Sequence, residues 1–370
     1  MEALNELEVR GKDFRLILKM LMNLDKAVVV FVPGVMGSKL RFRGAGDFGE
    51  PIDEVVWGSN LVQNLDVLAT HPQRLASGDL HPDGVIASLE LGGWLVVPLY
   101  GPLLSFCRSG AGLGLIDGQN LFLYSYDWRA DNRETARKLG KFIDSIDRAG
   151  ERELFLIAHS MGGLVCRLLL LADAAIASHV RLLFQIASPI RGSAKAFDSL
   201  RRHPRFDKLF DALWRLAHRL NPDHRARLME TLTDFASLYQ LLPPKDIVTL
   251  VTEDGAQYDA LYREAWPAHL RSMLDLADQV HTLLAAPVPS PVRCVYAKEH
   301  ETPFLYLVNR DWSIKAEKIE APGDGTVTCA SAYADSRLEQ RSVISGPSTE
   351  HADLPANDRV LELLRKEISG

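Results

Sequence analysis

The sequence predicts an α/β fold, in which helices cover both faces of a mostly parallel β-sheet. Two observations support this fold class. Short β-branched or aromatic runs of strand length recur along the chain, and helical periodicity follows several of them. The predicted strands cover residues 27–32, 121–126, 153–157, 182–187 and 292–297.

The clearest predicted helix follows the strand at 121–126. Near its start lie Asp131 and Glu134, whose spacing is that of a capping box. One apolar face then repeats at helical spacing and contains Leu139, Phe142, Ile143 and Ile146. A strand followed by an amphipathic helix is the repeating unit of a parallel sheet.

Two long segments, 39–119 and 196–290, interrupt this alternation. The first carries turn signals such as HPDG, and the second is helical in pattern. Because structureless loops of this length are rare in compact domains, we expect both insertions to build a cap or lid over the carboxyl edge of the sheet. The chain is then one domain, 1–370, whose core spans roughly residues 25–38, 120–195 and 290–370.

The composition disfavours several classes of function. Lys and Arg number 42 against 48 Asp and Glu, so the positive charge that nonspecific nucleic-acid binding needs is missing. The four cysteines form no zinc motif or disulfide framework, and we expect neither a metal nor a cofactor. An acidic N-terminus and the lack of an apolar run of about 18 residues predict a cytoplasmic protein with no membrane span.

The segment FLIAHSMGG places Ser160 between a predicted strand and a predicted helix. A nucleophile elbow has this context, since its strained turn closes only around small flanking residues. Ala158 replaces the first glycine of the common G-x-S-x-G pattern, while Gly162 and Gly163 keep the helix side open. The helix N-terminus after Ser160 favours negative charge there. Ser160 is therefore the predicted nucleophile.

A nucleophilic serine requires a base, and His351 is the predicted one. It lies in a loop after the run RSVIS and before the helical pattern NDRVLELLRKEI, from which it can reach back over the sheet edge. A loop histidine that is merely solvated is the alternative. His159 adjoins Ser160, but neighbouring side chains at an elbow point apart, so we expect His159 to pack beside the sheet.

Asp324 is the predicted acid that orients the base. It lies between two glycines directly after a short extended run, although PGDG is also an ordinary turn signature. The order Ser160, Asp324, His351 is that of α/β-hydrolases. The competing acids, in weaker contexts, are Asp311, Asp335 and Asp353.

Backbone amides are predicted to hold the oxyanion. Pro33 and Gly34 turn the chain sharply after the first strand, which leaves the amide of Val35 free to face the nucleophile. Met161, at the start of the elbow helix, supplies the second amide. A plain strand-ending turn at 33–34 is the alternative.

Seven segments occur in the order of a known family: VFVPGVMGSKL, YSYDWR, FLIAHSMGG, IASPIRGSAKA, SLYQLLP, GDGTV and EHADLP. In them the chain resembles the lecithin:cholesterol acyltransferase and phospholipid:diacylglycerol acyltransferase family of α/β-hydrolases, over roughly residues 27–38, 120–195 and 290–368. The resemblance implies an α/β-hydrolase fold and the same triad and oxyanion donors. Without a lid cysteine pair, signal peptide or membrane anchor, the chain resembles a soluble, bacterial-type member.

The motifs and the resemblance together predict a serine hydrolase or acyltransferase that cleaves carboxylic esters of lipids, as a phospholipase A or a lipase does. An esterase of a bulky soluble ester or lactone is the alternative, and a catalytically idle hydrolase fold used for binding is a third. No motif identifies an acceptor alcohol or an oligomeric state. The candidates for substrate contact are Trp57, Trp128 and Trp214.

The segment 201–227 combines an apolar helical stripe with many basic side chains. This composition predicts peripheral contact between the cap and an anionic membrane surface. A helix that packs on its own domain has the same stripe, and this is the alternative.

Overall fold

A computed structural model of the protein describes residues 27–45, 50–70, 72–91, 95–147, 150, 152–201, 230–333 and 339–369. At its centre lies a six-stranded sheet in the order β15-β12-β9-β8-β1-β7, and every adjacent pair is parallel. Its strands are β1 (Ala27–Val32), β7 (Leu121–Leu123), β8 (Glu153–His159), β9 (Val180–Ile186), β12 (Val292–Ala297) and β15 (Glu339–Ile344). The predicted α/β fold is confirmed, because all five predicted strands contribute to this sheet.

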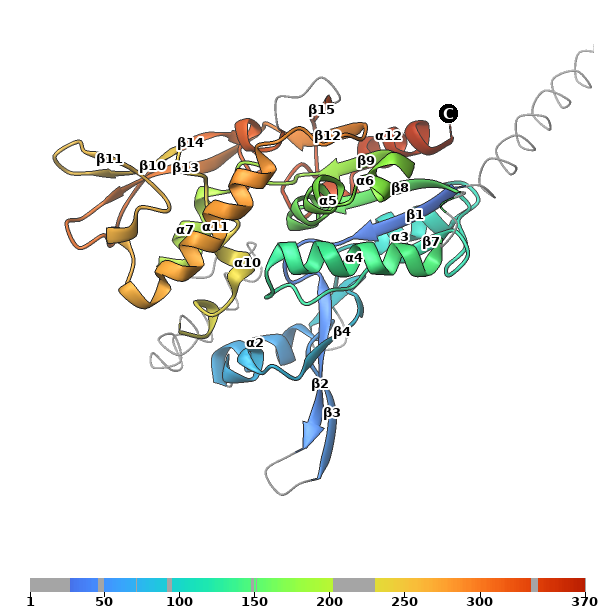
Figure 1. The fold of residues 1–370 in the computed structure, drawn as a ribbon, viewed down its shortest axis with the longest axis horizontal. Helices are drawn as coiled ribbons and strands as arrows, with labels where there is room; N and C mark the ends of the chain where they lie inside the picture. The colour runs from blue at the N-terminus through green and yellow to red at the C-terminus, as the bar shows by residue number, and fades with distance from the viewer. Residues whose placement is uncertain are drawn as a thin grey trace, which may run out of the picture.

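Helices cover both faces of the central sheet (Figure 1). One face is covered by α4 (Asn132–Ile146), α5 (Met161–Ala172), α6 (Ala174–His179) and α11 (Arg271–Leu284), and the other by α3 (Gly101–Arg108) and α12 (Asp358–Ser369). All six residues of β1 are buried. A strand covered on both faces needs apolar side chains at every position, which explains the unbroken run AVVVFV.

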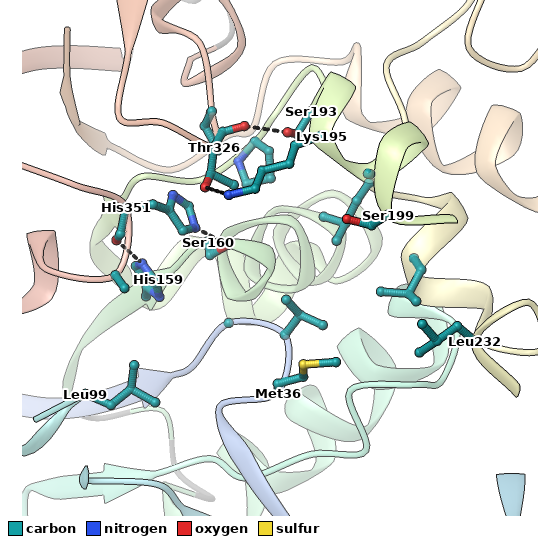
Figure 2. A pocket seen from close by; sticks show the side chains of 18 of the residues that line it. Met36, Leu99, His159, Ser160, Ser193, Lys195, Ser199, Leu232, Thr326 and His351 are labelled. Carbon is teal, nitrogen blue, oxygen red and sulfur yellow. Dashed lines mark hydrogen bonds between the residues drawn. The ribbon is translucent and has the colours of Figure 1, made fainter. Parts of the chain in front are cut away.

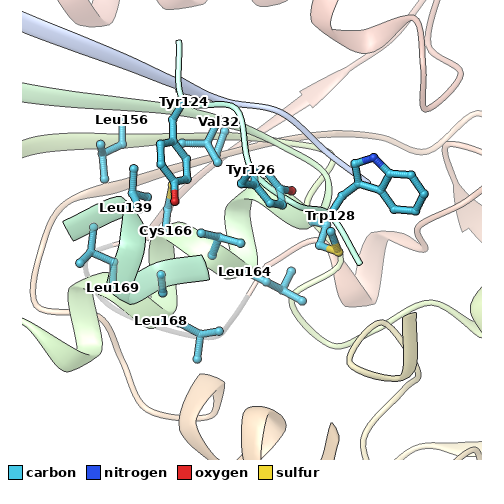
Figure 3. Close-up of a cluster of buried hydrophobic side chains, with 14 of the residues drawn as sticks. Val32, Tyr124, Tyr126, Trp128, Leu139, Leu156, Leu164, Cys166, Leu168 and Leu169 are labelled. Atoms are coloured by element: carbon cyan, nitrogen blue, oxygen red, sulfur yellow. The ribbon is translucent and has the colours of Figure 1, made fainter. Parts of the chain in front are cut away.

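The elbow helix α5 packs against both the central sheet and the neighbouring helix α4. Figure 3 shows Leu164 and Leu169 of α5 beside Val32 of β1, Leu156 of β8 and Leu139 of α4, and all five are buried. Burial of this much apolar surface stabilises the position of α5. The residue at the start of α5 therefore sits on a rigid scaffold.

α4 begins where the capping pattern predicts. Asp131 is its N-cap, and its side chain accepts a hydrogen bond of 2.8 Å from the amide of Arg133. Glu134 pairs instead with Lys138 one turn later, at 2.8 Å. The predicted helix is confirmed, and a cap that satisfies a first-turn amide explains its start.

The first predicted insertion, 39–119, contains small antiparallel sheets. β2 (Ser38–Ala45), β3 (Pro51–Trp57) and β4 (Leu80–Val85) form one of them, and the β2–β3 hairpin projects from the body (Figure 1). The other elements are α2 (Leu61–Thr70), the 3₁₀ turn η1 (Pro72–Ala76) and the hairpin of β5 (Ser88–Leu91) and β6 (Leu95–Pro98). α3 also falls in this range, but it packs on the central sheet.

The second predicted insertion, 196–290, is not helical throughout. Besides α7 (Ala194–Arg201), α10 (Ala236–Tyr239) and α11, it contains β10 (Val248–Thr252) and β11 (Gln257–Asp259). These strands join β13 (His300–Val308) and β14 (Ile314–Gly323) in a four-stranded sheet beside the central one (Figure 1). Nearly all of the segment 201–227 lies outside the described residues.

The remaining elements are 3₁₀ turns: η2 (Arg263–Ala265), η3 (Ala268–Leu270), η4 (Cys329–Ser331) and η5 (Leu354–Ala356). No helix within the described ranges combines the length and the apolar content that crossing a bilayer requires.

Candidate active site

Ser160 lies at a sharp turn between β8 and α5. Its backbone has φ 52° and ψ −126°, a strained conformation for a residue with a side chain. Its amide donates to the carbonyl of Ile186 at 2.9 Å. A Cβ on Gly34 would lie 2.9 Å from the Ser160 Cβ, and one on Gly162 would lie 2.4 Å from the carbonyl oxygen of Val32. Close packing between this turn and the loop after β1 therefore requires glycine at position 162 and at position 34.

His351 connects Ser160 with Asp324. Its Nε2 lies 2.9 Å from Ser160 Oγ, and its Nδ1 lies 2.8 Å from Asp324 Oδ2. Asp324 directly follows β14, and His351 lies in the loop before α12, so three distant segments meet at the carboxyl end of β8. Both separations are those of hydrogen bonds between a nucleophile, a base and an orienting acid.

Asp324 is almost completely buried, with 2% of its surface exposed. One carboxylate oxygen accepts from the amides of Thr326 at 2.9 Å and Val327 at 2.7 Å, and the other accepts from His351. Burial opposes ionisation, but the charge of His351 and these hydrogen bonds outweigh it and lower the pKa of Asp324. An ionised Asp324 keeps a proton on Nδ1 of His351, which leaves Nε2 able to accept from Ser160.

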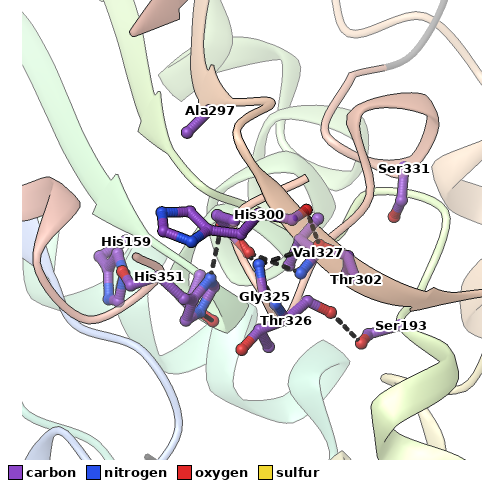
Figure 4. A network of polar contacts seen from close by, with 12 residues as sticks. His159, Ser193, Ala297, His300, Thr302, Gly325, Thr326, Val327, Ser331 and His351 are labelled. Atoms are coloured by element: carbon purple, nitrogen blue, oxygen red, sulfur yellow. Dashed lines mark hydrogen bonds and ion pairs between the residues drawn. The ribbon is translucent and has the colours of Figure 1, made fainter. Parts of the chain in front are cut away.

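The loop that carries Asp324 is tied to its surroundings through the backbone. Thr302 of β13 accepts a hydrogen bond of 2.9 Å from the amide of Gly325 (Figure 4). The amide of His351 donates to the carbonyl of Asp324 at 3.0 Å. The acid and the base are thus held by main-chain contacts as well as by their side chains.

The two predicted oxyanion donors flank Ser160. Val35 lines the cavity beside Ser160, and Met161 is the first residue of α5. Within the described part of the chain, neither amide donates a hydrogen bond to another residue. The neighbouring Gly34 amide, in contrast, donates to Tyr100 Oη at 2.9 Å. Among the described residues, both amides are therefore available to donate, as the predicted oxyanion role requires.

The sequence did not single out Tyr100 as a site residue, and it gave His159 only a packing role. His159 is indeed buried, but its Nδ1 lies 2.8 Å from Tyr100 Oη and its Nε2 lies 3.1 Å from the carbonyl oxygen of His351. Burial, together with the charge of His351, lowers the pKa of His159 to about 3. No local pattern marks Tyr100, which lies in the range predicted as an insertion.

A cavity of about 210 Å³ opens beside Ser160 (Figure 2). Lys195 lines it and donates to Thr326 Oγ1 at 3.2 Å. Most of the described lining is apolar and includes Met36, Leu61, Leu99, Leu200, Leu232 and Val327. Cavities with apolar walls and a few convergent polar groups are typical ligand sites.

The three tryptophan candidates for substrate contact have different positions. Trp57 lines the cavity, and its Nε1 donates to the carbonyl of Met36 at 3.0 Å. Trp128 is fully buried behind Trp57, with ring centroids 5.6 Å apart, and donates to the carbonyl of Ser38. Because Trp128 does not reach the cavity, its assignment to substrate contact is corrected to a packing role. Trp214 lies outside the described residues.

Comparison with protein families places this site in context. A model of the lecithin:cholesterol acyltransferase family matches residues 100–243. The chain therefore resembles the lecithin:cholesterol acyltransferase family. This confirms the resemblance predicted from the sequence motifs. The matched range includes Ser160 and Trp128, whereas Asp324 and His351 lie beyond it.

Two curated proteins of Arabidopsis thaliana are similar to part of the chain. Lecithin-cholesterol acyltransferase-like 4 is 35% identical and Phospholipase A(1) LCAT3 is 37% identical, each over 86 residues. These alignments cover 22% of this chain, 16% of the first relative and 19% of the second. The chain thus matches less than a fifth of the length of either relative.

A chain in the crystal structure of the Tle4-Tli4 complex is similar over 93% of this chain and 98% of that chain. The TM-score is 0.53 at 13% sequence identity, so the likeness concerns the fold alone. The fold is an α/β-hydrolase fold, as the lecithin:cholesterol acyltransferase resemblance implies. Among the described residues, no cluster of three His, Cys, Asp or Glu side chains is arranged to hold a metal ion.

Proposed function

We propose that this protein is a serine hydrolase or acyltransferase that cleaves carboxylic esters of lipids through an acyl-enzyme on Ser160. The observation that carries this proposal is the hydrogen-bonded series Ser160, His351 and Asp324, with distances of 2.9 Å and 2.8 Å. The strained elbow supports the same chemistry, as do the nearby amides of Val35 and Met161, which donate to no other described residue.

In the first step, Ser160 Oγ attacks the ester carbonyl carbon while His351 Nε2 takes the hydroxyl proton. The amides of Val35 and Met161 hold the negative oxygen of the tetrahedral intermediate. The bond between the carbonyl carbon and the alcohol oxygen then breaks. The protonated His351 gives its proton to the leaving alcohol, and the acyl group remains on Ser160.

In the second step, water or another alcohol attacks the acyl-enzyme, and His351 accepts its proton. The new bond to the carbonyl carbon forms as the bond to Ser160 Oγ breaks, and His351 returns the proton to Ser160. Water gives a free acid, whereas an alcohol gives a new ester. The two outcomes use the same residues and differ only in the acceptor.

Lipid as the acyl donor is supported by the apolar cavity and by the family resemblance. The walls beside Ser160 offer hydrocarbon contacts for an acyl chain, for example from Met36, Leu99 and Leu232. One relative carries the name Phospholipase A(1), which agrees with an ester bond of a phospholipid as the target. Peripheral membrane contact and a cytoplasmic location remain predictions from the sequence.

Labelling with a fluorophosphonate probe tests the nucleophile. We expect the wild-type protein to be labelled and Ser160→Ala not to be. Ser178→Ala is the matched control, because Ser178 is an exposed serine of α6 whose hydroxyl donates to the carbonyl of Ala175. If the folded wild type takes up no label, the proposed enzyme function is wrong.

The substrate class is tested by comparing phosphatidylcholine vesicles with a soluble p-nitrophenyl ester. We expect release of fatty acid from the vesicles, and we expect Ser160→Ala to abolish it. If the protein hydrolyses the soluble ester equally well with and without vesicles and leaves the phospholipid intact, the alternative of a soluble-ester esterase is favoured.

A further inference from the structure

A series of hydrogen bonds lies beside the proposed nucleophile and joins two loops of the candidate site. The Gly34 amide donates to Tyr100 Oη at 2.9 Å, Tyr100 Oη lies 2.8 Å from His159 Nδ1, and His159 Nε2 lies 3.1 Å from the carbonyl oxygen of His351. Tyr100 and His159 are 2% and 4% exposed. Both side chains also line the cavity, so these hydrogen bonds lie in its buried wall, where exclusion of water strengthens them.

The chemistry of the groups decides which one donates and which one accepts in each of these hydrogen bonds. A carbonyl oxygen only accepts, so His159 carries its proton on Nε2 and donates to His351. Because the ring is buried and stays neutral at ordinary pH, Nδ1 has no proton and accepts from the Tyr100 hydroxyl. The same hydroxyl oxygen accepts from Gly34. All these groups are satisfied, and only one tautomer of His159 fits.

The two ends of this series of hydrogen bonds, Gly34 and His351, adjoin the groups that the proposed reaction uses. Gly34 precedes Val35, whose amide is the proposed oxyanion donor. At the other end, the main chain of His351 is held on both sides, since its amide donates to Asp324 and its carbonyl accepts from His159. A shift of either loop would change the distance between Ser160 and its partners.

We propose that Tyr100 and His159 are positioning residues. They hold the loop of Gly34 and Val35, the oxyanion loop, in a fixed position relative to the loop of His351. This inference rests on the proposed function of Ser160. Neither residue touches the reacting atoms in this role, and each acts through a main-chain group of a neighbour. The alternative is that the pair only satisfies buried polar groups and leaves catalysis unchanged.

The variant Tyr100→Phe tests this positioning role, because it removes the hydroxyl and keeps the ring. We expect kcat for a soluble p-nitrophenyl ester to fall about 10- to 100-fold, with KM nearly unchanged. Tyr124→Phe is the matched control. Tyr124 is also a buried tyrosine, 7% exposed, and its hydroxyl donates at 3.2 Å to the carbonyl of Thr135 in α4, so its removal leaves kcat unchanged.

Two substitutions of His159 separate positioning from packing. Glutamine can still place an N–H near the position of Nε2, whereas leucine cannot, so we expect His159→Gln to retain more of kcat than His159→Leu. Once one substitution has broken the hydrogen-bonded connection between the two loops, the other substitution should lower kcat little further. The double variant Tyr100→Phe/His159→Leu is therefore expected to have about the same kcat as His159→Leu.

Thermal unfolding and fluorophosphonate labelling of each variant make the outcomes distinguishable. A folded Tyr100→Phe protein with wild-type kcat would overturn the positioning role, as would losses in kcat that multiply in the double variant. If Tyr100→Phe does not fold, the comparison of glutamine and leucine at position 159 decides. Absence of labelling in the wild type would instead refute the proposed function itself.

Discussion

Replacing Gly162 with alanine tests how closely the elbow must approach the oxyanion loop. An added Cβ would lie 2.4 Å from the carbonyl oxygen of Val32 and 2.6 Å from that of Pro33. Carbon and oxygen atoms in contact are normally about 3.3 Å apart or more, so the two backbones must separate by about 0.9 Å. Both obstacles are main-chain atoms, which cannot rotate away as a side chain can.

A separation of this size lies at the point where the proposed reaction is most sensitive. Pro33 is two residues before Val35, and Gly162 follows Met161, so the shift changes the spacing of the two oxyanion amides. Misplacement by about 1 Å lowers rates about 100-fold, and loss of one oxyanion donor costs a similar factor or more. We therefore expect kcat of Gly162→Ala to fall at least about 100-fold, or about 2.7 kcal/mol in the barrier.

The assay is steady-state hydrolysis of a soluble p-nitrophenyl ester, with thermal unfolding of the same samples. Gly78→Ala is the control, because a Cβ at Gly78 meets no atom within 4 Å. We expect that control to keep the wild-type kcat. A folded Gly162→Ala protein with wild-type kcat would show that the elbow and the oxyanion loop do not need this close contact.

Three further outcomes follow from the buried polar groups. Asp324→Asn is expected to lower kcat about 10⁴-fold without unfolding the protein, since the wrong tautomer of the base is then favoured; a rate within tenfold of wild type would contradict this role of Asp324. Burial lowers the pKa of His159 to about 3 and that of His281 to about 4. Below pH 6.5 these histidines bind protons in the unfolded chain but stay neutral in the folded protein. Denaturant titrations should therefore show that the free energy of unfolding falls by about 2 kcal/mol per histidine between pH 7 and pH 5. Equal free energies of unfolding at the two pH values would contradict this prediction. Arg167 and Glu339 form a fully buried ion pair of 2.5 Å. Arg167→Met should lower the free energy of unfolding by about 3–5 kcal/mol, because it leaves the buried charge of Glu339 without a partner. Adding Glu339→Leu should restore stability. A loss below about 1 kcal/mol in Arg167→Met would contradict this reasoning.

Local patterns in the sequence determine the central sheet and the candidate nucleophile. The run AVVVFV is apolar at every position because β1 is covered on both faces, and Asp131 marks the start of α4 because a cap must satisfy a first-turn amide. Ser160 stands out because small residues must surround an elbow. Chain order and local context together favour Asp324, which lies between two glycines, and His351, which lies in a loop after a predicted strand.

Contacts between distant segments are what only the tertiary structure decided. The Tyr100–His159 bond joins residues 59 positions apart, and the bond from His159 to the His351 carbonyl spans 192. Neither periodicity nor turn chemistry encodes such contacts. For the same reason, β10 escaped prediction, because its partner β13 lies about fifty residues later in the chain.

The different environments of Trp57 and Trp128 illustrate the same limit. The sequence predicts substrate contact for both residues, yet one lines the cavity and the other is buried behind it. Which face of a side chain meets the cavity depends on how the first insertion folds over the sheet. The sequence by itself therefore determined which residues could carry out ester chemistry, and the packing of distant segments decided how they are held and what surrounds them.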